Sequence, residues 1–153
     1  MTAYLIRHAT AGNREEWHQP DDLRPLDDEG RRQAEGLADQ LAGCPVDRVL
    51  SSSALRCRET VEPLAARRGL AVELADELVD TAGVDEALAL LERHAGEHVV
   101  LSTHGELVPD VIRRLADEGM VVEGDGGSDK GSTWVLEREG DRWARARWLA
   151  PPT

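Results

Sequence analysis

The 153-residue chain, with 41% hydrophobic and 31% charged residues, has the composition of a folded protein and the length of one ordinary domain, so we expect a single domain over residues 1–153. Its net charge of −12 argues against a nucleic-acid or anionic-membrane partner. No apolar run approaches the roughly 20 residues that span a bilayer, and no basic, apolar leader follows Met1, so we expect a cytoplasmic protein.

The first predicted element is a short apolar strand. Residues 3–7 suit a buried central strand, and the strand runs directly into Arg7 and His8. The polar segment 9–25 that follows is too long for a simple connection, and loops of this kind often carry binding residues. Its Arg14, Trp17, His18 and Arg24 are candidates for shaping a substrate pocket, and a solvated loop is the alternative.

A helix is predicted from Asp27, which can cap its amino end, to about Gly43. Acidic residues crowd its first turn, as the helix dipole favours. One face of the helix is apolar and consists of Ala34, Leu37, Ala38 and Leu41.

Two further pairs of a strand and a helix follow. Residues 47–51 predict a strand that leads into a helix beginning near Ala54, and Pro63 should kink or split this helix because proline lacks a backbone donor. Residues 70–74 predict a third strand. The periodic apolar face of the next helix consists of Val84, Ala87, Leu88 and Leu91.

The last third of the chain completes a sheet. Residues 98–103 predict a strand, a helix with an apolar face follows it, and residues 119–131 form a glycine-rich loop. Residues 132–138 and 143–149 predict two strands joined by a tight turn. The alternation of strands and helices predicts an α/β fold: a three-layer sandwich with a mostly parallel central sheet flanked by helices.

Charged and nucleophilic residues follow the predicted strands. Arg7 and His8, Arg56, and His104 each lie just beyond the carboxyl end of a strand, and these ends meet at one crevice in an open α/β sheet. Guanidinium groups bind phosphate oxygens as fixed forks. A neutral imidazole can attack phosphorus while a second one stabilises the transferring group. The pattern predicts a phosphate pocket that needs no metal or cofactor, and Cys44 and Cys57 have no metal-ligand spacing.

Four segments resemble the motifs of the histidine phosphatase superfamily, whose fold is phosphoglycerate mutase-like. They are Leu5-Ile6-Arg7-His8-Ala9, the helix start Leu26 to Ala34, residues 51–60 from Ser51 to Thr60, and Ser102-Thr103-His104-Gly105. The resemblance implies that His8 is the phosphorylated nucleophile. It also implies that Arg7, Arg56 and His104 complete the phosphate pocket.

Two departures from the family pattern bear on the chemistry. Ala9 stands where the family has glycine after Arg-His, so the turn must tolerate a Cβ. The family's general acid is commonly a glutamate, and the best match here is Asp80, with Glu77 and Glu106 as alternatives. Further candidates for substrate binding are Thr10, Arg24, Arg58, Gly105 and Lys130.

The substrate class stays open between a phosphorylated small molecule, a nucleotide and a phosphohistidine protein. Residues 130–136, among others, resemble the carboxyl-terminal phosphatase domain of mycobacterial Nudix hydrolases, but no segment resembles the Nudix half. Small bacterial phosphohistidine phosphatases are similar as well. A phosphomutase and a non-catalytic phospholigand-binding module, acting with a separate Nudix protein, are the alternatives to a phosphatase. A mutase would release little inorganic phosphate, and a binding module would turn nothing over.

Overall fold

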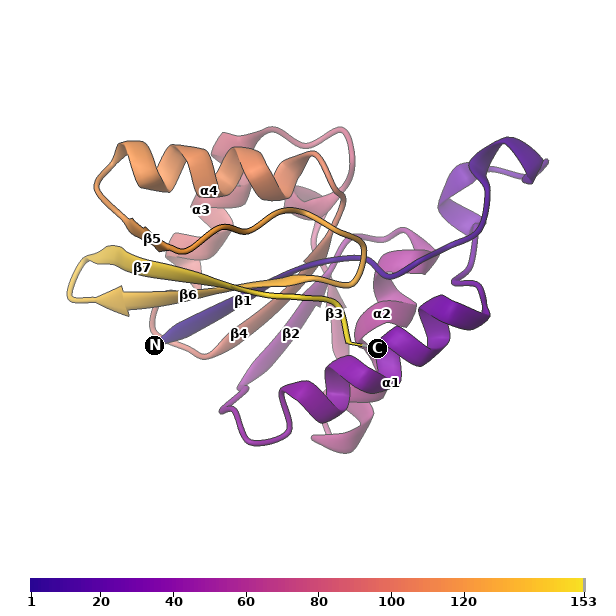
Figure 1. The fold of residues 1–153 in the computed structure, drawn as a ribbon, viewed down its shortest axis with the longest axis horizontal. Coiled ribbons are helices and arrows are strands. Elements are labelled where there is room, and N and C mark those ends of the chain that lie inside the picture. Colours follow the sequence, from indigo (N-terminus) through magenta and orange to yellow (C-terminus); the bar gives the residue numbers. More distant parts are fainter. Residues whose placement is uncertain (153) are drawn as a thin grey trace.

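The computed structural model describes residues 1–152, which form a central sheet with helices on both faces (Figure 1). The sheet has seven strands in the order β3-β2-β4-β1-β6-β7-β5. The strands are β1 (Thr2–Arg7), β2 (Arg48–Ser51), β3 (Val72–Leu74), β4 (Val99–Thr103), β5 (Val121–Glu123), β6 (Thr133–Glu139) and β7 (Arg142–Leu149). Within the described residues, every strand except β6 runs in the same direction, which confirms the predicted sandwich with a mostly parallel sheet.

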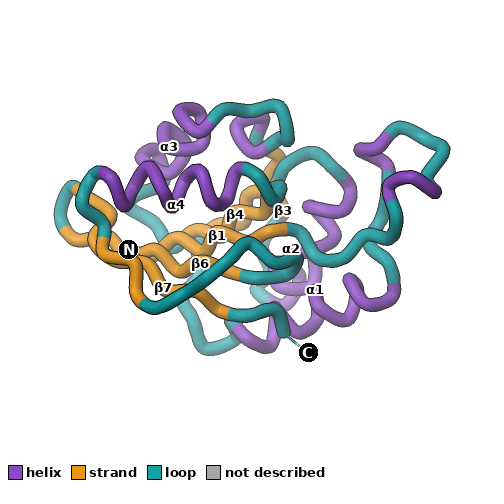
Figure 2. Tube along the Cα trace, turned by 45° about the horizontal axis from the view of Figure 1, so that its top comes forward, coloured by secondary structure: helices purple, strands orange, loops and turns teal. Residues whose placement is uncertain are grey.

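Two helices cover each face of the sheet (Figure 2). The helices are α1 (Asp28–Gln40), α2 (Leu55–Arg67), α3 (Val84–Arg93) and α4 (Leu107–Asp117). Helix α1 begins where predicted, because the Asp27 carboxylate accepts a hydrogen bond from the Gly30 amide at 2.7 Å. No helix within residues 1–152 is both long and apolar enough to cross a membrane.

Strand β1 lies in the middle of the sheet and is buried on both faces. Ala3 and Leu5 pack with α3 and α4, whereas Tyr4 and Ile6 pack with α1 and α2. Side chains alternate between the faces of a strand, so both faces of β1 must be apolar. This placement brings the end of β1, and with it Arg7 and His8, to the centre of the sheet edge.

Helix α2 runs without interruption through Pro63, so the predicted split is wrong. The helix buries Thr60 and Val61 before the proline and Leu64 and Ala65 after it. Packing on both sides of the proline outweighs the loss of one backbone hydrogen bond, which is worth about 1 kcal/mol.

Two element boundaries differ from the sequence prediction. The stretch 119–131 is not entirely loop, because Val121–Glu123 forms the edge strand β5 and pairs in parallel with β7. Three residues are too few to show a periodic pattern. The third strand begins at Val72 and not at residue 70, because the Leu70 amide donates a hydrogen bond to the Ala65 carbonyl at the end of α2.

Candidate active site

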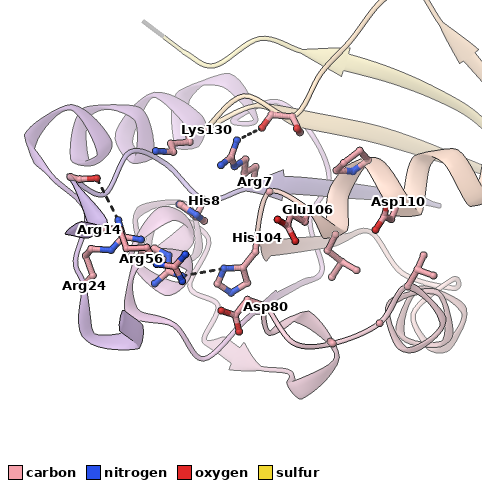
Figure 3. Close-up of a pocket in the computed structure, with 18 of the residues that line it drawn as sticks. Arg7, His8, Arg14, Arg24, Arg56, Asp80, His104, Glu106, Asp110 and Lys130 are labelled. Carbon is pink, nitrogen blue, oxygen red and sulfur yellow. Dashed lines mark hydrogen bonds between the residues drawn. The ribbon is translucent and has the colours of Figure 1, made fainter. Parts of the chain in front are cut away.

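The carboxyl ends of β1 and β4 meet at a cleft of about 1120 Å³. Arg7 at the end of β1 pairs with Thr103 at the end of β4. The residues that follow, His8 and His104, therefore lie side by side, with ring centroids 5.8 Å apart. Arg56 enters the cleft from the first turn of α2 (Figure 3). The structure thus brings together the four side chains that the motifs single out.

The other candidate residues divide between the cleft lining and positions outside it. The additional lining residues are Arg14, Arg24, Asp80, Gly105 and Lys130. Thr10, Trp17, His18 and Arg58 lie outside the lining. The Thr10 hydroxyl donates to Gln33 Oε1 on α1 at 3.1 Å. Arg58 is two residues beyond Arg56, about 200° around the helix axis, so one helix does not present both arginines to the cleft.

His8 is held as a neutral imidazole with a free ring nitrogen. Its Nδ1 lies 2.8 Å from the Ala9 carbonyl oxygen, which can only accept a hydrogen bond. The proton is therefore on Nδ1, and Nε2 keeps its lone pair. Burial, together with the charges of Arg56 and Arg7, lowers the pKa of His8 to about 3 against the opposing effect of the Ala9 hydrogen bond.

His104 is oriented by hydrogen bonds to Arg56 and Ser52, and Cys57 Sγ lies 3.7 Å from its Nε2. Its Nδ1 lies 3.4 Å from Arg56 Nη2, which can only donate, so Nδ1 is the acceptor. Its Nε2–H then donates to the Ser52 hydroxyl at 2.9 Å. Burial and the Arg56 charge hold the pKa of His104 below its usual value, although Asp80 opposes them. Ser52 lies in the motif of residues 51–60 but was not identified from the sequence as a partner of His104, and its position directly after β2 is the signal that could have identified it.

Gly105 gives Arg7 its place in the cleft. The Arg7 Nη1 donates to the Ser128 carbonyl at 2.7 Å, and its guanidinium group lies over the Gly105 backbone. A Cβ on residue 105 would lie 2.5 Å from both Cζ and Nε of Arg7. The predicted substrate-binding glycine is therefore also the residue whose missing side chain leaves room for the arginine. Burial lowers the pKa of Arg7, but an arginine stays charged at all working pH values.

Asp21 joins three arginines and was not identified from the sequence. It lies on the short 3-10 helix η2 (Asp21–Leu23), within the segment 9–25. Its carboxylate contacts Arg56 Nη2 at 2.9 Å, Arg24 Nε at 3.2 Å and Arg14 Nε at 3.4 Å. Its backbone carbonyl also accepts from Arg56 Nη1 at 2.9 Å. Burial raises the pKa of Asp21, but these arginines outweigh burial and hold it below its ordinary value. An acid in a polar loop carries no sequence signal for such a role.

The turn after β1 accommodates Ala9 without strain. No residue other than glycine has a positive φ in the described part of the chain, so Ala9 keeps an ordinary backbone conformation. Its amide donates to the Thr60 hydroxyl at 2.9 Å. The start of α1 packs against the same turn, because a Cβ on Gly30 would lie 1.9 Å from the Thr10 carbonyl oxygen. The helix-start motif therefore fixes the loop that carries His8.

Carboxylates line the side of the cleft opposite Arg14, Arg24 and Arg56 (Figure 3). They are Asp80, Glu106 and Asp110. The third candidate acid, Glu77, pairs with Arg93 outside the cleft lining. Two of the three candidate acids therefore face the cleft. Among residues 1–152, no group of three His, Cys, Asp or Glu side chains is arranged to hold a metal ion.

Two solved phosphatases share this fold. The chain superposes on the protein histidine phosphatase SixA complexed with tungstate, with a TM-score of 0.77 and 21% identity over 100% of this chain and 97% of that one. A mycobacterial glucosyl-3-phosphoglycerate phosphatase complexed with VO3 gives a TM-score of 0.74 and 17% identity, with 99% of both chains covered.

The amino-acid sequence is also similar to that of a curated protein. The 8-oxo-(d)GTP phosphatase of Mycolicibacterium smegmatis is 33% identical over 99% of this chain, which spans only 48% of that relative. The family profile that matches residues 3–89 is that of the histidine phosphatase superfamily, branch 1. This match covers β1, α1, β2 and α2 with the Arg7-His8 and Arg56 segments. The predicted family and enzyme class are thereby confirmed: the chain belongs to the histidine phosphatase superfamily.

Proposed function

We propose that the protein is a metal-independent phosphatase that hydrolyses a phosphomonoester or phosphoramidate through a phosphohistidine on His8. The observation that carries this proposal is the hydrogen bond from His8 Nδ1 to the Ala9 carbonyl. It leaves Nε2 unprotonated in a cleft that Arg7, Arg56 and His104 also line. A neutral imidazole at this position is a competent nucleophile.

In the first step, His8 Nε2 attacks phosphorus, an N–P bond forms and the bond to the leaving group breaks. The leaving group takes a proton from Asp80, for which Glu106 is the alternative donor in the lining. A good leaving group, such as the imidazole of a phosphohistidine protein, needs less help from an acid.

Arg7 and Arg56 carry the charge stabilisation. Arg56 places a buried guanidinium group in the cleft and Arg7 a half-buried one, and attraction for an oxyanion is stronger there than in water. Asp21, Ser128 and His104 orient these groups before any ligand arrives. Phosphoryl transfer depends mainly on positioning and electrostatics of this kind. Arg24, Gly105 and Lys130 extend the proposed binding surface.

In the second step, water attacks the phosphorus of phosphohistidine, the N–P bond breaks and inorganic phosphate leaves. The carboxylate that donated a proton in the first step accepts one from this water. His8 returns to the neutral form that its surroundings favour.

The comparisons support an oxyanion ligand and leave several substrates open. Tungstate, which the SixA structure contains, is a tetrahedral oxyanion like phosphate. The curated relative acts on an oxidised guanine nucleotide, but this chain spans about half of it, so that activity does not transfer as a whole. We propose a phosphorylated small molecule, a nucleotide or a phosphohistidine protein as substrate.

Replacement of His8 tests the proposal. His8→Ala should abolish release of inorganic phosphate while the protein keeps its fold by circular dichroism. His18→Ala is the matched control, because His18 is an exposed histidine outside the cleft lining. Its replacement should leave the release of inorganic phosphate unchanged. The wild-type protein, quenched during turnover, should carry an acid-labile phosphate on His8, and activity should persist in EDTA. Full activity of His8→Ala would overturn the proposal.

A further inference from the structure

A second pocket of about 360 Å³ opens beside the cleft. The two cavities share Pro109 and Ser128 in their linings. The Ser128 carbonyl accepts a hydrogen bond from Arg7 Nη1 at 2.7 Å, so the rim of the second pocket touches an arginine of the proposed phosphate site. A ligand whose phosphate contacts Arg7 can therefore extend into the second pocket.

One wall of this pocket is apolar and belongs to the protein core. Ile112 of α4, Val122 of β5 and Trp134 of β6 line it. Ile112 and Trp134 are only 8% and 5% exposed and lie in the same core cluster, against which Val122 packs. The wall is therefore held in place before any ligand binds.

The glycine-rich segment 124–128 forms another part of the lining, and it is held against the indole ring of Trp134. The Trp134 Nε1 donates to the Gly127 carbonyl at 2.9 Å. A Cβ on Gly126 would lie 2.7 Å from the same ring. Arg113 and Asp125 add polar groups to this lining. An apolar wall with a few polar groups around it suits a planar heteroaromatic ring.

The first turn of α4 borders both cavities, because Pro109 belongs to both linings. Glu106 and Asp110 line the cleft there, on either side of Pro109 in the sequence. Carboxylates accept hydrogen bonds and repel other anions. The part of a ligand that crosses this turn should therefore carry hydroxyl donors and no negative charge. A pentose meets both conditions.

We infer that the second pocket binds the base of a nucleoside monophosphate whose phosphate group occupies the cleft. This inference rests on the proposed function. It selects a nucleotide from the substrate classes that the catalytic groups alone leave open.

Two substrates that differ only in the base provide the test. Guanosine 5′-monophosphate and ribose 5-phosphate share the pentose and the phosphate. Contact of the base with an aromatic side chain should raise kcat/KM for the nucleotide by about tenfold over the sugar phosphate. Val122→Trp should fill the pocket and remove this preference without changing ribose 5-phosphate hydrolysis. Val121→Trp is the matched control, because Val121 is the adjacent strand residue, is 60% exposed and lies outside the lining. Thermal melting should show that both variants fold.

The outcomes separate this inference from the proposed function. Equal kcat/KM for the two compounds, with the same ratio in Val122→Trp, would overturn the inference, while His8-dependent phosphate release would still support the phosphatase. If neither compound releases phosphate, calorimetric binding of the nucleotide to the wild-type protein tests the pocket directly. Nucleotide binding that is lost in Val122→Trp and kept in Val121→Trp would support the inference that the second pocket binds the base. Absence of binding to the wild-type protein would overturn the inference.

Discussion

Replacing Gly105 with alanine should disable the phosphate site through Arg7. The added Cβ would lie 2.5 Å from Arg7 Cζ and Nε and 2.8 Å from Nη2, distances that real Cβ contacts do not reach. The guanidinium group must move, because it is the mobile partner of the clash. Its hydrogen bond to the Ser128 carbonyl then breaks or lengthens.

The size of the effect follows from what Arg7 supplies. Loss of one preorganised donor to the transition state costs about 3 kcal/mol, or about a hundredfold in kcat. We expect Gly105→Ala to lose about this much in phosphate release. Gly96→Ala is the matched control, because a Cβ at Gly96 meets nothing within 4 Å. It should keep wild-type activity.

A double-mutant cycle decides whether the effect passes through Arg7. Once Arg7 is replaced by alanine, the side chain at residue 105 has no guanidinium group to displace, so Gly105→Ala should add little further loss. Wild-type kcat in Gly105→Ala would refute this reasoning. Fully additive losses in the double variant would refute it as well.

Two further predictions concern protonation. Folding lowers the pKa of His8 from about 6.5 to about 3, so between these two pH values the unfolded chain binds a proton at His8 and the folded chain does not. The free energy of unfolding should therefore be highest above about pH 6.5 and should fall as the pH drops. Between pH 7 and pH 5 the wild type should lose about 2 kcal/mol of unfolding free energy more than His8→Ala in urea titrations, and parallel curves would contradict this. If Asp80 is the general acid, Asp80→Asn should lower kcat about a hundredfold or more with an alkyl phosphate but little with p-nitrophenyl phosphate. Glu77→Gln is the control and should change neither rate, because Glu77 pairs with Arg93. A larger loss of kcat in Glu106→Gln would assign the acid to Glu106.

The sequence predicts the parts of the site that follow strands. Arg7, His8 and His104 are predictable because parallel strands bring their carboxyl ends to one edge of the sheet. Arg56 is predictable because a family motif places it at the start of a helix. The apolar periodicity also locates α1, α3 and α4, since a buried face repeats with the helical period.

The groups that orient these residues are harder to predict. Asp21 acts on Arg56 from a loop 35 residues away in the sequence, through contacts that depend on how that loop folds back. The sequence does not distinguish Ser52 from Ser51 and Ser53. The structure shows that Ser52 is the serine that contacts His104. Arg58 was predicted to bind substrate but lies outside the cleft lining. Its place close to Arg56 in the sequence does not determine the side of the helix on which it lies.

The charge distribution is compatible with the proposed phosphate site in an acidic protein. The net charge of −12 is spread over the chain, and salt screens it beyond about 10 Å. Inside the cleft the local charges dominate, and Arg7 and Arg56 both lower the pKa of His8. Asp21 neutralises part of Arg56 from one side and leaves the potential at His8 positive. The Asp21 carboxylate therefore orients the Arg56 guanidinium group and leaves the proposed phosphate position open. In a closed ion pair, the carboxylate itself would occupy that position.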